Sequence, residues 1–310
     1  MYDTIYMQLK NEDAPHTDFL SEVPCFLNDI SEHVYNNGVV IGGYVGNLSI
    51  SVSSHVVKVR EGSICKYFLG DNMQTMSRKA TGQALQMLSD ALHLPMNKAH
   101  ITRMDIAQNF VMRYPIEAYL CHLGTLQRKT PLKEPNGLYY PLNGGRLCFY
   151  DKVREQKKAR CAISEVFEGK NVLRYERRFT DKIAHALNKP DITASMLYDE
   201  DFYINVLDLW YKQYQAIQKI NQTQIDFTQM KSKQDLYRNG ILALAQSVGG
   251  CNQLIEQVQT AQKKGELSRQ TAHNLRQAIN DACSCNLALH QSEEIEELNK
   301  KMCQAVKYYR

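Results

Sequence analysis

Three segments of this chain carry charged or phenolic side chains at every second position, with apolar residues between them. Alternate residues of a β-strand share one face, so each segment predicts a strand with one charged face. These faces carry Arg103 and Asp105 in residues 101–107, Arg146 and Tyr150 in residues 146–150, with Lys152 beyond them if that strand continues, and Arg174, Glu176 and Arg178 in residues 171–179. A sheet with one solvated face has the same alternation, so the pattern alone leaves a purely structural explanation open.

If the three strands are neighbours, their charged faces form a site suited to phosphoryl transfer. Asp105 and Glu176 offer the hard oxygen ligands that suit one Mg²⁺ or Mn²⁺ ion, which keeps water and phosphate oxygens as further ligands. Such an ion polarises the scissile phosphate and neutralises developing charge. Arginine side chains would hold the flanking phosphates, because a planar guanidinium group matches phosphate oxygens. The candidates for this DNA-binding role are Arg103, Arg146, Arg174 and Arg178.

Tyr150 is the candidate nucleophile. A free tyrosine has a pKa of roughly 10, so its phenolate needs electrostatic help from the cation or from Lys152. Attack on phosphorus gives a phosphotyrosine diester, which keeps the bond energy for later resealing. Among the eighteen tyrosines, three others lie near the same segments. Tyr175 is expected to pack in the core, whereas Tyr139 and Tyr140 could stack on a base.

The elements that must position these strands are antiparallel hairpins and one amphipathic helix. Strand-like runs at residues 4–10, 39–41, 48–52 and 56–59 are separated by glycines and turn residues. Ser77 is expected to cap a helix that ends near Leu94, before Pro95. Residues 124–137 are polar and contain two prolines, which predicts a loop.

The pattern becomes helical after residue 183, with helical spacing in residues 201–220, 234–248, 252–264, 268–283 and 292–308. The chain is therefore predicted to be α+β, with an antiparallel-sheet catalytic domain at 1–183 and an all-helical domain at 184–310. The helices at 252–264 and 268–283 fit either a helix-turn-helix, with Arg269 and Arg276 directed at a DNA groove, or an ordinary helical hairpin that packs on the catalytic part, which is preferred. The last helix either packs internally or joins two copies in a homo-oligomer.

Composition narrows the class of protein. The 310 residues are 44% hydrophobic and include no apolar run long enough for a bilayer and no secretory signal. The net charge of +4 is only mildly basic, but residues 146–182 hold eleven Lys or Arg against six Asp or Glu. A basic stretch of this kind often binds phosphate, although by itself it more often forms a solvated surface. Nine scattered cysteines with no Cys-x-x-Cys pair predict reduced thiols in the cytoplasm, and neither a zinc ribbon nor a disulfide framework.

These segments resemble the gene II/X family of phage and plasmid replication proteins. The resemblance runs from residue 1 to about residue 220 and follows the family's order. It rests on the opening strand at residues 1–9, Ile-Thr-Arg-Met-Asp-Ile at 101–106, Arg-Leu-Cys-Phe-Tyr-Asp-Lys at 146–152, Leu-Arg-Tyr-Glu-Arg-Arg at 173–178 and Asp-Leu-Trp at 208–210. The segments are also similar to the trans-acting plasmid replication initiators, which nick DNA by the same route.

The resemblance implies a rolling-circle replication initiator with a fold related to the HUH nickases, divalent-metal dependence, and Tyr150 of the Tyr-x-Lys element as nucleophile. HUH enzymes usually bind metal through a His-hydrophobic-His pair, and none of the nine histidines here forms one, so Asp105 and Glu176 are expected to replace it. The implied partners are origin DNA, single-stranded or supercoiled, and the host helicase and polymerase. Two alternatives stay open: a mobilisation relaxase with the same chemistry, and a non-enzymatic origin-binding protein that controls copy number.

Overall fold

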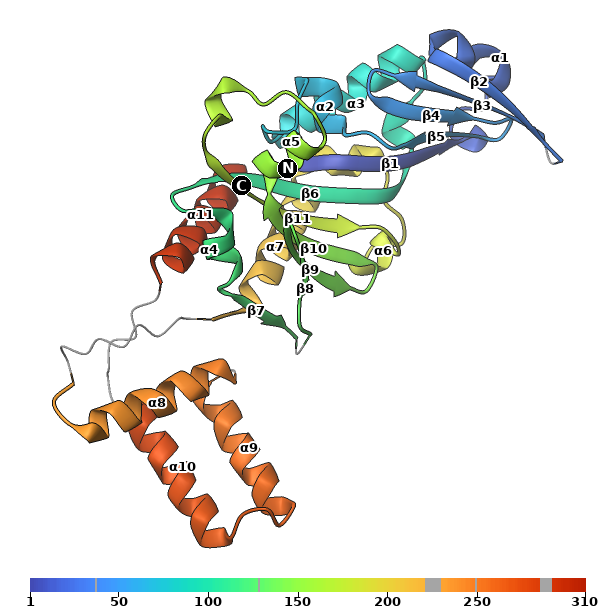
Figure 1. The fold of residues 1–310 in the computed structure, drawn as a ribbon. Coiled ribbons are helices and arrows are strands. Elements are labelled where there is room, and N and C mark those ends of the chain that lie inside the picture. The colour runs from blue at the N-terminus through green and yellow to red at the C-terminus, as the bar shows by residue number, and fades with distance from the viewer. Residues whose placement is uncertain (37, 128, 221–229, 249, 285–291) are drawn as a thin grey trace. The chain divides into compact units, whose positions relative to one another are not determined.

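The computed structural model describes residues 1–36, 38–127, 129–220, 230–248, 250–284 and 292–310 (Figure 1). Its main element is a ten-stranded sheet in the order β2-β3-β4-β5-β1-β6-β11-β10-β9-β8, antiparallel throughout. The strands are β1 (Tyr2–Lys10), β2 (Asn28–Tyr35), β3 (Gly38–Val45), β4 (Leu48–Val52), β5 (Val56–Arg60), β6 (His100–Met112), β8 (Leu132–Glu134), β9 (Gly137–Leu142), β10 (Gly145–Asp151) and β11 (Asn171–Phe179). The helices are α1 (Phe19–Glu22), α2 (Ile64–Leu69), α3 (Arg78–Leu92), α4 (Ile116–Leu120), α5 (Lys152–Lys158), α6 (Ile183–Ala186), α7 (Glu200–Gln215), α8 (Lys233–Ser247), α9 (Cys251–Lys263), α10 (Arg269–Ser284) and α11 (Glu293–Tyr309).

The three strands with charged faces are neighbours at the centre of this sheet. β11 lies between β6 and β10, and β1 lies on the other side of β6. Arg178 is opposite Asp105 on one side and Arg146 on the other, and Arg174 is opposite Tyr150. Residues opposite one another in an antiparallel pair share a face, so the charged faces are aligned on one side of the sheet.

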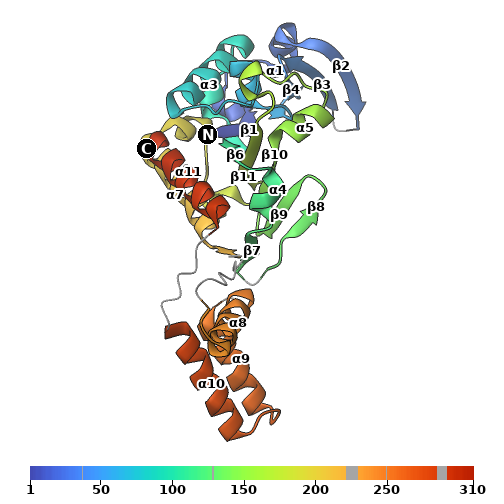
Figure 2. The same cartoon turned by 60° about the vertical axis from the view of Figure 1, so that its left-hand side comes forward.

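The other face of these strands forms the apolar core. Met104, Leu147 and Phe149 are fully buried there. The ring of Tyr175 stacks on Phe149 at 4.4 Å between centroids and lies 4.6 Å from the ring of Trp210 in α7. The expectation that Tyr175 packs in the core is confirmed, and Figure 2 shows α7 beside the strands that it covers.

Strand β10 stops at Asp151, and the chain turns directly into α5. The Asp151 carboxylate accepts a hydrogen bond from the Arg154 amide at 3.0 Å, which caps the helix. The strand therefore does not continue to Lys152, because the cap diverts the chain before that residue. Ser77 caps α3 as expected, accepting from the Ala80 amide at 3.2 Å.

The structure differs from the sequence prediction in two stretches. Residues 124–137, predicted as a loop, contain most of β7 (Leu123–Leu126) and all of β8. The sheet's edge strand β2 was not predicted, because all eight of its residues are exposed and none forms an apolar stripe. A strand that buries nothing carries no hydrophobic alternation to detect.

The contacts divide the chain into two compact units. The first comprises Met1–Ile116, Leu126–Ala216 and Lys300–Arg310, and the second comprises Glu117–Thr125 and Ile217–Asn299. These units do not coincide with the predicted division between residues 183 and 184. Residues 184–216 belong with the sheet, because Trp210 and Tyr214 of α7 are buried, with Tyr214 facing Phe149 and Tyr175.

In the second unit, α8, α9 and α10 pack around Ala245, Leu254 and Ile279. Their bounds confirm the predicted helices to within a residue at each end. The short strand β12 (Ile217–Lys219) pairs with β7, so the predicted helix over residues 201–220 is too long. No helix in the described parts of the chain is both long and apolar enough to span a bilayer.

A disulfide joins Cys251 at the start of α9 to Cys283 near the end of α10, with Cα atoms 6.6 Å apart. The expectation of reduced thiols throughout is wrong for this pair, because helix packing brings together two cysteines that are 32 positions apart. Since the first turn of α9 adjoins the last turn of α10, the two helices form an antiparallel hairpin. The hairpin agrees with the preferred alternative to a helix-turn-helix, and its packing on the catalytic part stays a prediction.

Candidate active site

A cavity of about 410 Å³ opens on the charged face of the sheet. It is lined by Asp3, Thr4, Asn47, Gly62, Ser63, Lys66, Asn72, Arg103, Asp105, Tyr150, Lys152, Glu155, Glu176 and Arg178. One cavity therefore brings together most of the site residues predicted from the strand faces. These are Tyr150, Lys152, Asp105, Glu176, Arg103 and Arg178. Their side chains come from β6, β10, β11 and the first turn of α5.

Tyr150 lines this cavity. Its Oη donates a hydrogen bond to Oε2 of Glu176 at 3.0 Å, and the residue is 7% exposed. Gly137, opposite Tyr150 on β9, lies so close that a Cβ there would be 2.8 Å from the Tyr150 Cβ. Burial raises the pKa of Tyr150 well above its usual value, and the nearby Glu176 carboxylate adds to the effect. The phenol is therefore protonated at neutral pH in this state.

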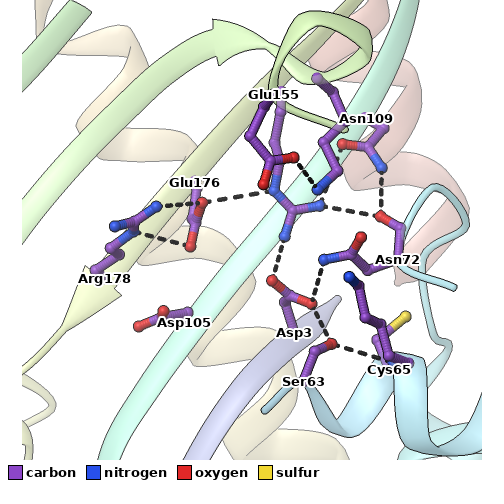
Figure 3. A network of polar contacts seen from close by, with 12 residues as sticks. Asp3, Ser63, Cys65, Asn72, Asp105, Asn109, Glu155, Glu176 and Arg178 are labelled. Carbon is purple, nitrogen blue, oxygen red and sulfur yellow. Dashed lines mark hydrogen bonds and ion pairs between the residues drawn. The ribbon is translucent and has the colours of Figure 1, made fainter. Parts of the chain in front are cut away.

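Glu176 is held by two arginines of its own strand (Figure 3). Arg178 Nε is 3.0 Å from its Oε1, and Arg174 Nε is 3.5 Å from its Oε2. Burial by itself would raise the pKa of Glu176, but the guanidinium groups of Arg174 and Arg178 outweigh burial and hold the pKa at about 2. Glu176 is thus a buried carboxylate that stays ionised.

Asp105 differs from Glu176 in its protonation. Arg103 contacts both of its oxygens, with Nη2 to Oδ2 at 2.6 Å and Nε to Oδ1 at 3.1 Å. Burial nevertheless raises the pKa of Asp105 to about 7; Arg103 opposes this rise, and repulsion from Glu176 adds to it. The two proposed metal ligands therefore differ: Glu176 stays ionised, whereas Asp105 titrates near neutral pH.

Arg174 lies beneath the cavity and is 2% exposed. Its Nη2 is 2.5 Å from Oδ2 of Asp3, and its Nη1 donates to Oδ1 of Asn109 at 3.2 Å and to the backbone oxygen of Asn72 at 3.3 Å. Figure 3 shows how this network joins β1, β6, β11 and the segment after α2. Its guanidinium is engaged by protein acceptors, so its predicted contact with phosphate stays a prediction.

Sequence patterns did not identify Asp3 and Asn109. Asp3 also accepts a hydrogen bond from Ser63 Oγ at 2.5 Å, which ties β1 to the N-cap of α2. Asn109 is four positions after Asp105 on the same face of β6, so extending the predicted strand past residue 107 could have found it. Asp3 carries no such signal, because its partners lie 60 and more positions away along the chain.

Lys152 is buried and lines the cavity from α5. Its Nζ donates to Oε2 of Glu155 at 2.7 Å. Burial lowers the pKa of Lys152, and the nearby guanidinium of Arg174 lowers it further. Glu155 also lines the cavity, and the sequence patterns did not identify it. It belongs to the short helix α5 and not to one of the charged strand faces.

The two arginines of the cavity lining, Arg103 and Arg178, are partly exposed, with side chains 24% and 21% exposed. The guanidinium of Arg103 lies 4.9 Å from the ring centroid of Tyr6. Arg146 does not line the cavity; it is exposed, and its guanidinium lies 5.5 Å from the ring of Tyr139.

Tyr140 is 1% exposed and belongs to the core, so its predicted role in stacking on a base is wrong. Tyr139, its neighbour in β9, is only partly buried. Arg269 and Arg276 belong to the second unit: Arg269 is exposed at the start of α10, whereas Arg276 is half-buried and its Nε donates to the Ala272 oxygen at 3.1 Å.

The carboxylates of this cavity suit a hard divalent cation by donor type. Asp105 and Glu176 offer oxygen ligands, and Mg²⁺ commonly binds one or two carboxylates together with water and phosphate oxygens. The residues that the structure describes contain no cluster of three or more His, Cys, Asp or Glu that could hold a metal by itself. Arginines now engage both carboxylates, so a cation there would replace arginine contacts.

The sequence matches the family model for the N-terminal region of the phage gene II replication-associated protein over residues 1–213, a stretch that includes every residue lining the cavity. The chain belongs to this family of phage replication-associated proteins, which confirms the resemblance to phage gene II replication proteins. No curated protein matches the sequence.

Proposed function

We propose that this chain is a rolling-circle replication initiator that nicks and religates one DNA strand at an origin. The observation that carries the proposal is the cavity in which Tyr150, two carboxylates and two partly exposed arginines meet. Membership in a phage replication family supports the biological role. The substrate is origin DNA, presented as a single strand or in a supercoiled duplex.

In the proposed reaction, Oη of Tyr150 attacks the phosphorus of the scissile phosphodiester. The bond from Oη to phosphorus forms, and the bond from phosphorus to the 3′ oxygen breaks. The phenolic proton is lost and the 3′ oxygen gains one, so the products are a 5′-phosphotyrosine and a free 3′-hydroxyl. Religation is the reverse exchange, and no external energy source is needed because one phosphodiester replaces another.

Asp105 and Glu176 are the proposed ligands of one Mg²⁺ or Mn²⁺ ion. The ion would supply positive charge beside the scissile phosphate. Charge on Glu176 disfavours the phenolate of Tyr150, so neutralising that carboxylate lowers the pKa of the phenol toward its ordinary value. Lys152 would favour the phenolate in the same direction when it is protonated.

Arg103 and Arg178 are the proposed phosphate ligands. Each pairs with a cavity carboxylate when DNA is absent, and each guanidinium is more exposed than that of Arg174. A phosphate group entering the cavity offers these arginines an alternative anion, which frees the carboxylate oxygens for the cation. DNA and cation are therefore expected to bind cooperatively.

Incubation of the protein with a single-stranded oligonucleotide that carries the cognate origin, in Mg²⁺ or Mn²⁺, tests this function. A denaturing gel and peptide mass spectrometry should reveal a DNA adduct on the peptide that contains Tyr150. An adduct on another tyrosine would overturn the assignment of the nucleophile. Tight binding without an adduct would favour the non-enzymatic origin-binding protein.

A further inference from the structure

The helix that follows Tyr150 carries an exposed basic edge. Lys157, Lys158 and Arg160 are exposed at the end of α5 and just beyond it, and we call these three residues the α5 edge. Within the part of the chain that the structure describes, no ion pair joins any of them to a carboxylate. Three exposed cations that no ion pair neutralises form a favourable surface for an anionic polymer.

The α5 edge is held firmly beside the cavity. Val153 of α5 belongs to a small apolar cluster with Met73 and Val172 of β11, and Ile163 and Phe167 pack against that cluster. The helix therefore rests on the sheet through its apolar side and presents its basic side outward. Its first residue, Lys152, lines the cavity, so the edge lies within one short helix of the proposed nucleophile.

The segment also reaches the other side of the cavity. Cys161 follows Arg160, and its Sγ lies 3.8 Å from Nζ of Lys66. Lys66 belongs to α2 and lines the cavity. Residues 152–161 therefore run from β10 to α2 alongside the cavity. At about 1.5 Å of rise per helical residue, Lys158 is about 9 Å beyond Lys152 along the axis of α5.

We infer that the α5 edge binds the backbone phosphates of the DNA strand that enters this cavity, within a few nucleotides of the bond to be broken. The inference rests on the proposed function for the identity of that strand. Phosphate contacts fix the register of a protein on DNA without reading its sequence, so the edge would position the strand and leave the choice of origin to other residues. Single-stranded DNA is the expected occupant, because the buried phenol of Tyr150 must reach a phosphate inside a cavity.

The test compares two double variants of equal charge change. Lys157→Ala/Lys158→Ala removes two cations of the edge. Lys79→Ala/Lys189→Ala removes two exposed lysines from segments that do not line the cavity. Binding of a fluorescent single-stranded oligonucleotide is measured by anisotropy between about 50 and 200 mM salt, the range in which phosphate contacts are strongly screened.

We expect the edge variant to bind more weakly and its plot of log K against log salt to be shallower by about 1.4, since each phosphate contact to a single strand contributes about 0.7. The control variant should keep the slope of the parent protein. Equal slopes for both variants and the parent would overturn the inference. A shallower slope in both variants would overturn it as well, because the effect would then reflect net charge rather than the α5 edge.

A second measurement separates this inference from the proposed function. The yield of covalent adduct is measured for the parent protein in a single turnover at saturating DNA. Absence of any adduct with the parent protein, combined with the expected loss of slope, would remove the nicking function and leave the α5 edge as a DNA-binding surface. Normal adduct formation by the parent protein, combined with an unchanged slope in the edge variant, would support the nicking function and overturn the role of the α5 edge.

Discussion

The hydroxyl of Tyr150 donates a hydrogen bond of 3.0 Å to the carboxylate of Glu176, so the proposed nucleophile and a proposed metal ligand are in direct contact. The pair lies between two neighbouring strands, with the Glu176 carboxylate fixed by Arg174 and Arg178. Burial keeps the phenol protonated and the charge of Glu176 adds to this effect, so a change of charge at the carboxylate acts directly on the phenol.

Tyr150→Phe should abolish the covalent adduct and leave DNA binding within a few-fold of the parent. The phenol makes a buried hydrogen bond, whose loss typically costs about 1 kcal/mol of unfolding free energy, so the variant should still fold. Adduct yield on a denaturing gel and binding by anisotropy are the two measurements. Nicking that persists in this variant would place the nucleophile elsewhere.

Glu176→Gln should lose cation-dependent cleavage and also destabilise the protein by about 3 kcal/mol, because it removes the buried charge that pairs with Arg174 and Arg178. The loss stays at the lower end for a broken buried ion pair, since Arg174 keeps its contact with Asp3. Glu155→Gln is the matched control in the same cavity. The Glu155 side chain is 41% exposed, and the glutamine oxygen can still accept from Lys152 Nζ, so the unfolding free energy of this variant should change by no more than about 1 kcal/mol. Urea unfolding followed by circular dichroism measures both variants, and equal losses would contradict this account of Glu176.

Cation binding should depend on pH through Asp105, whose pKa is raised to about 7 by burial. The folded chain holds the Asp105 proton below pH 7, and that proton must leave before a cation binds. We expect the affinity for Mn²⁺ to fall by up to about ten-fold per pH unit below pH 7, and Asp105→Asn to bind weakly with little pH dependence. Electron paramagnetic resonance titration between about pH 5.5 and pH 8 checks this, and Glu176, with its pKa at about 2, does not titrate in that window.

The same shift has a consequence for stability in the absence of metal. A carboxyl whose folded pKa is raised contributes stability that is fully present below its unfolded pKa of about 4 and is lost as pH rises through the folded value. Asp105 should therefore make the metal-free protein less stable at pH 8 than at pH 6, and Asp105→Asn should remove that difference. A parent protein whose unfolding free energy is the same at both pH values would argue against the raised pKa.

Arg178→Ala and Arg174→Ala should separate phosphate binding from structural support. Arg178 has a partly exposed side chain at the cavity, so its removal should weaken DNA binding and make the salt dependence shallower by about 0.7. Arg174 is buried against Asp3 and Glu176, so its removal should cost about 3–5 kcal/mol of stability. Anisotropy and urea unfolding on both variants are the measurements, and a fully stable Arg174→Ala would contradict its structural role.

Reduction of the disulfide between Cys251 and Cys283 should destabilise the α8–α10 bundle by about 3–4 kcal/mol, since the bond closes a long loop in the unfolded chain. The sheet and its cavity belong to the other compact unit and should keep their stability. Hydrogen exchange with and without dithiothreitol measures the two units separately. Equal protection of α9 and α10 in both conditions would show that the bond adds nothing to stability.

Local pattern determined much of the fold. The alternation of side chains predicted both ends of β11 correctly. It did so because charged side chains lie on one face of that strand and mostly apolar side chains on the other. The cap at Ser77 located α3 for a similar reason, since its side chain satisfies an amide only three residues away. The same local rules assigned Arg103 and Asp105 to one face, and their ion pair confirms it.

Tertiary structure decided what those faces do. Alternation assigns a residue to a face but not to a neighbouring strand, so the alignment of Tyr150 with Glu176 depended on β10 and β11 pairing in one register. Covering elements then decided burial. Asp3 from β1 and the segment after α2 enclose Arg174, although its sequence pattern equals that of the more exposed Arg178. Burial raises the free energy of a charged carboxylate, and it therefore decides the protonation of Asp105. This burial comes from contacts between residues far apart in the chain, which no local sequence pattern encodes.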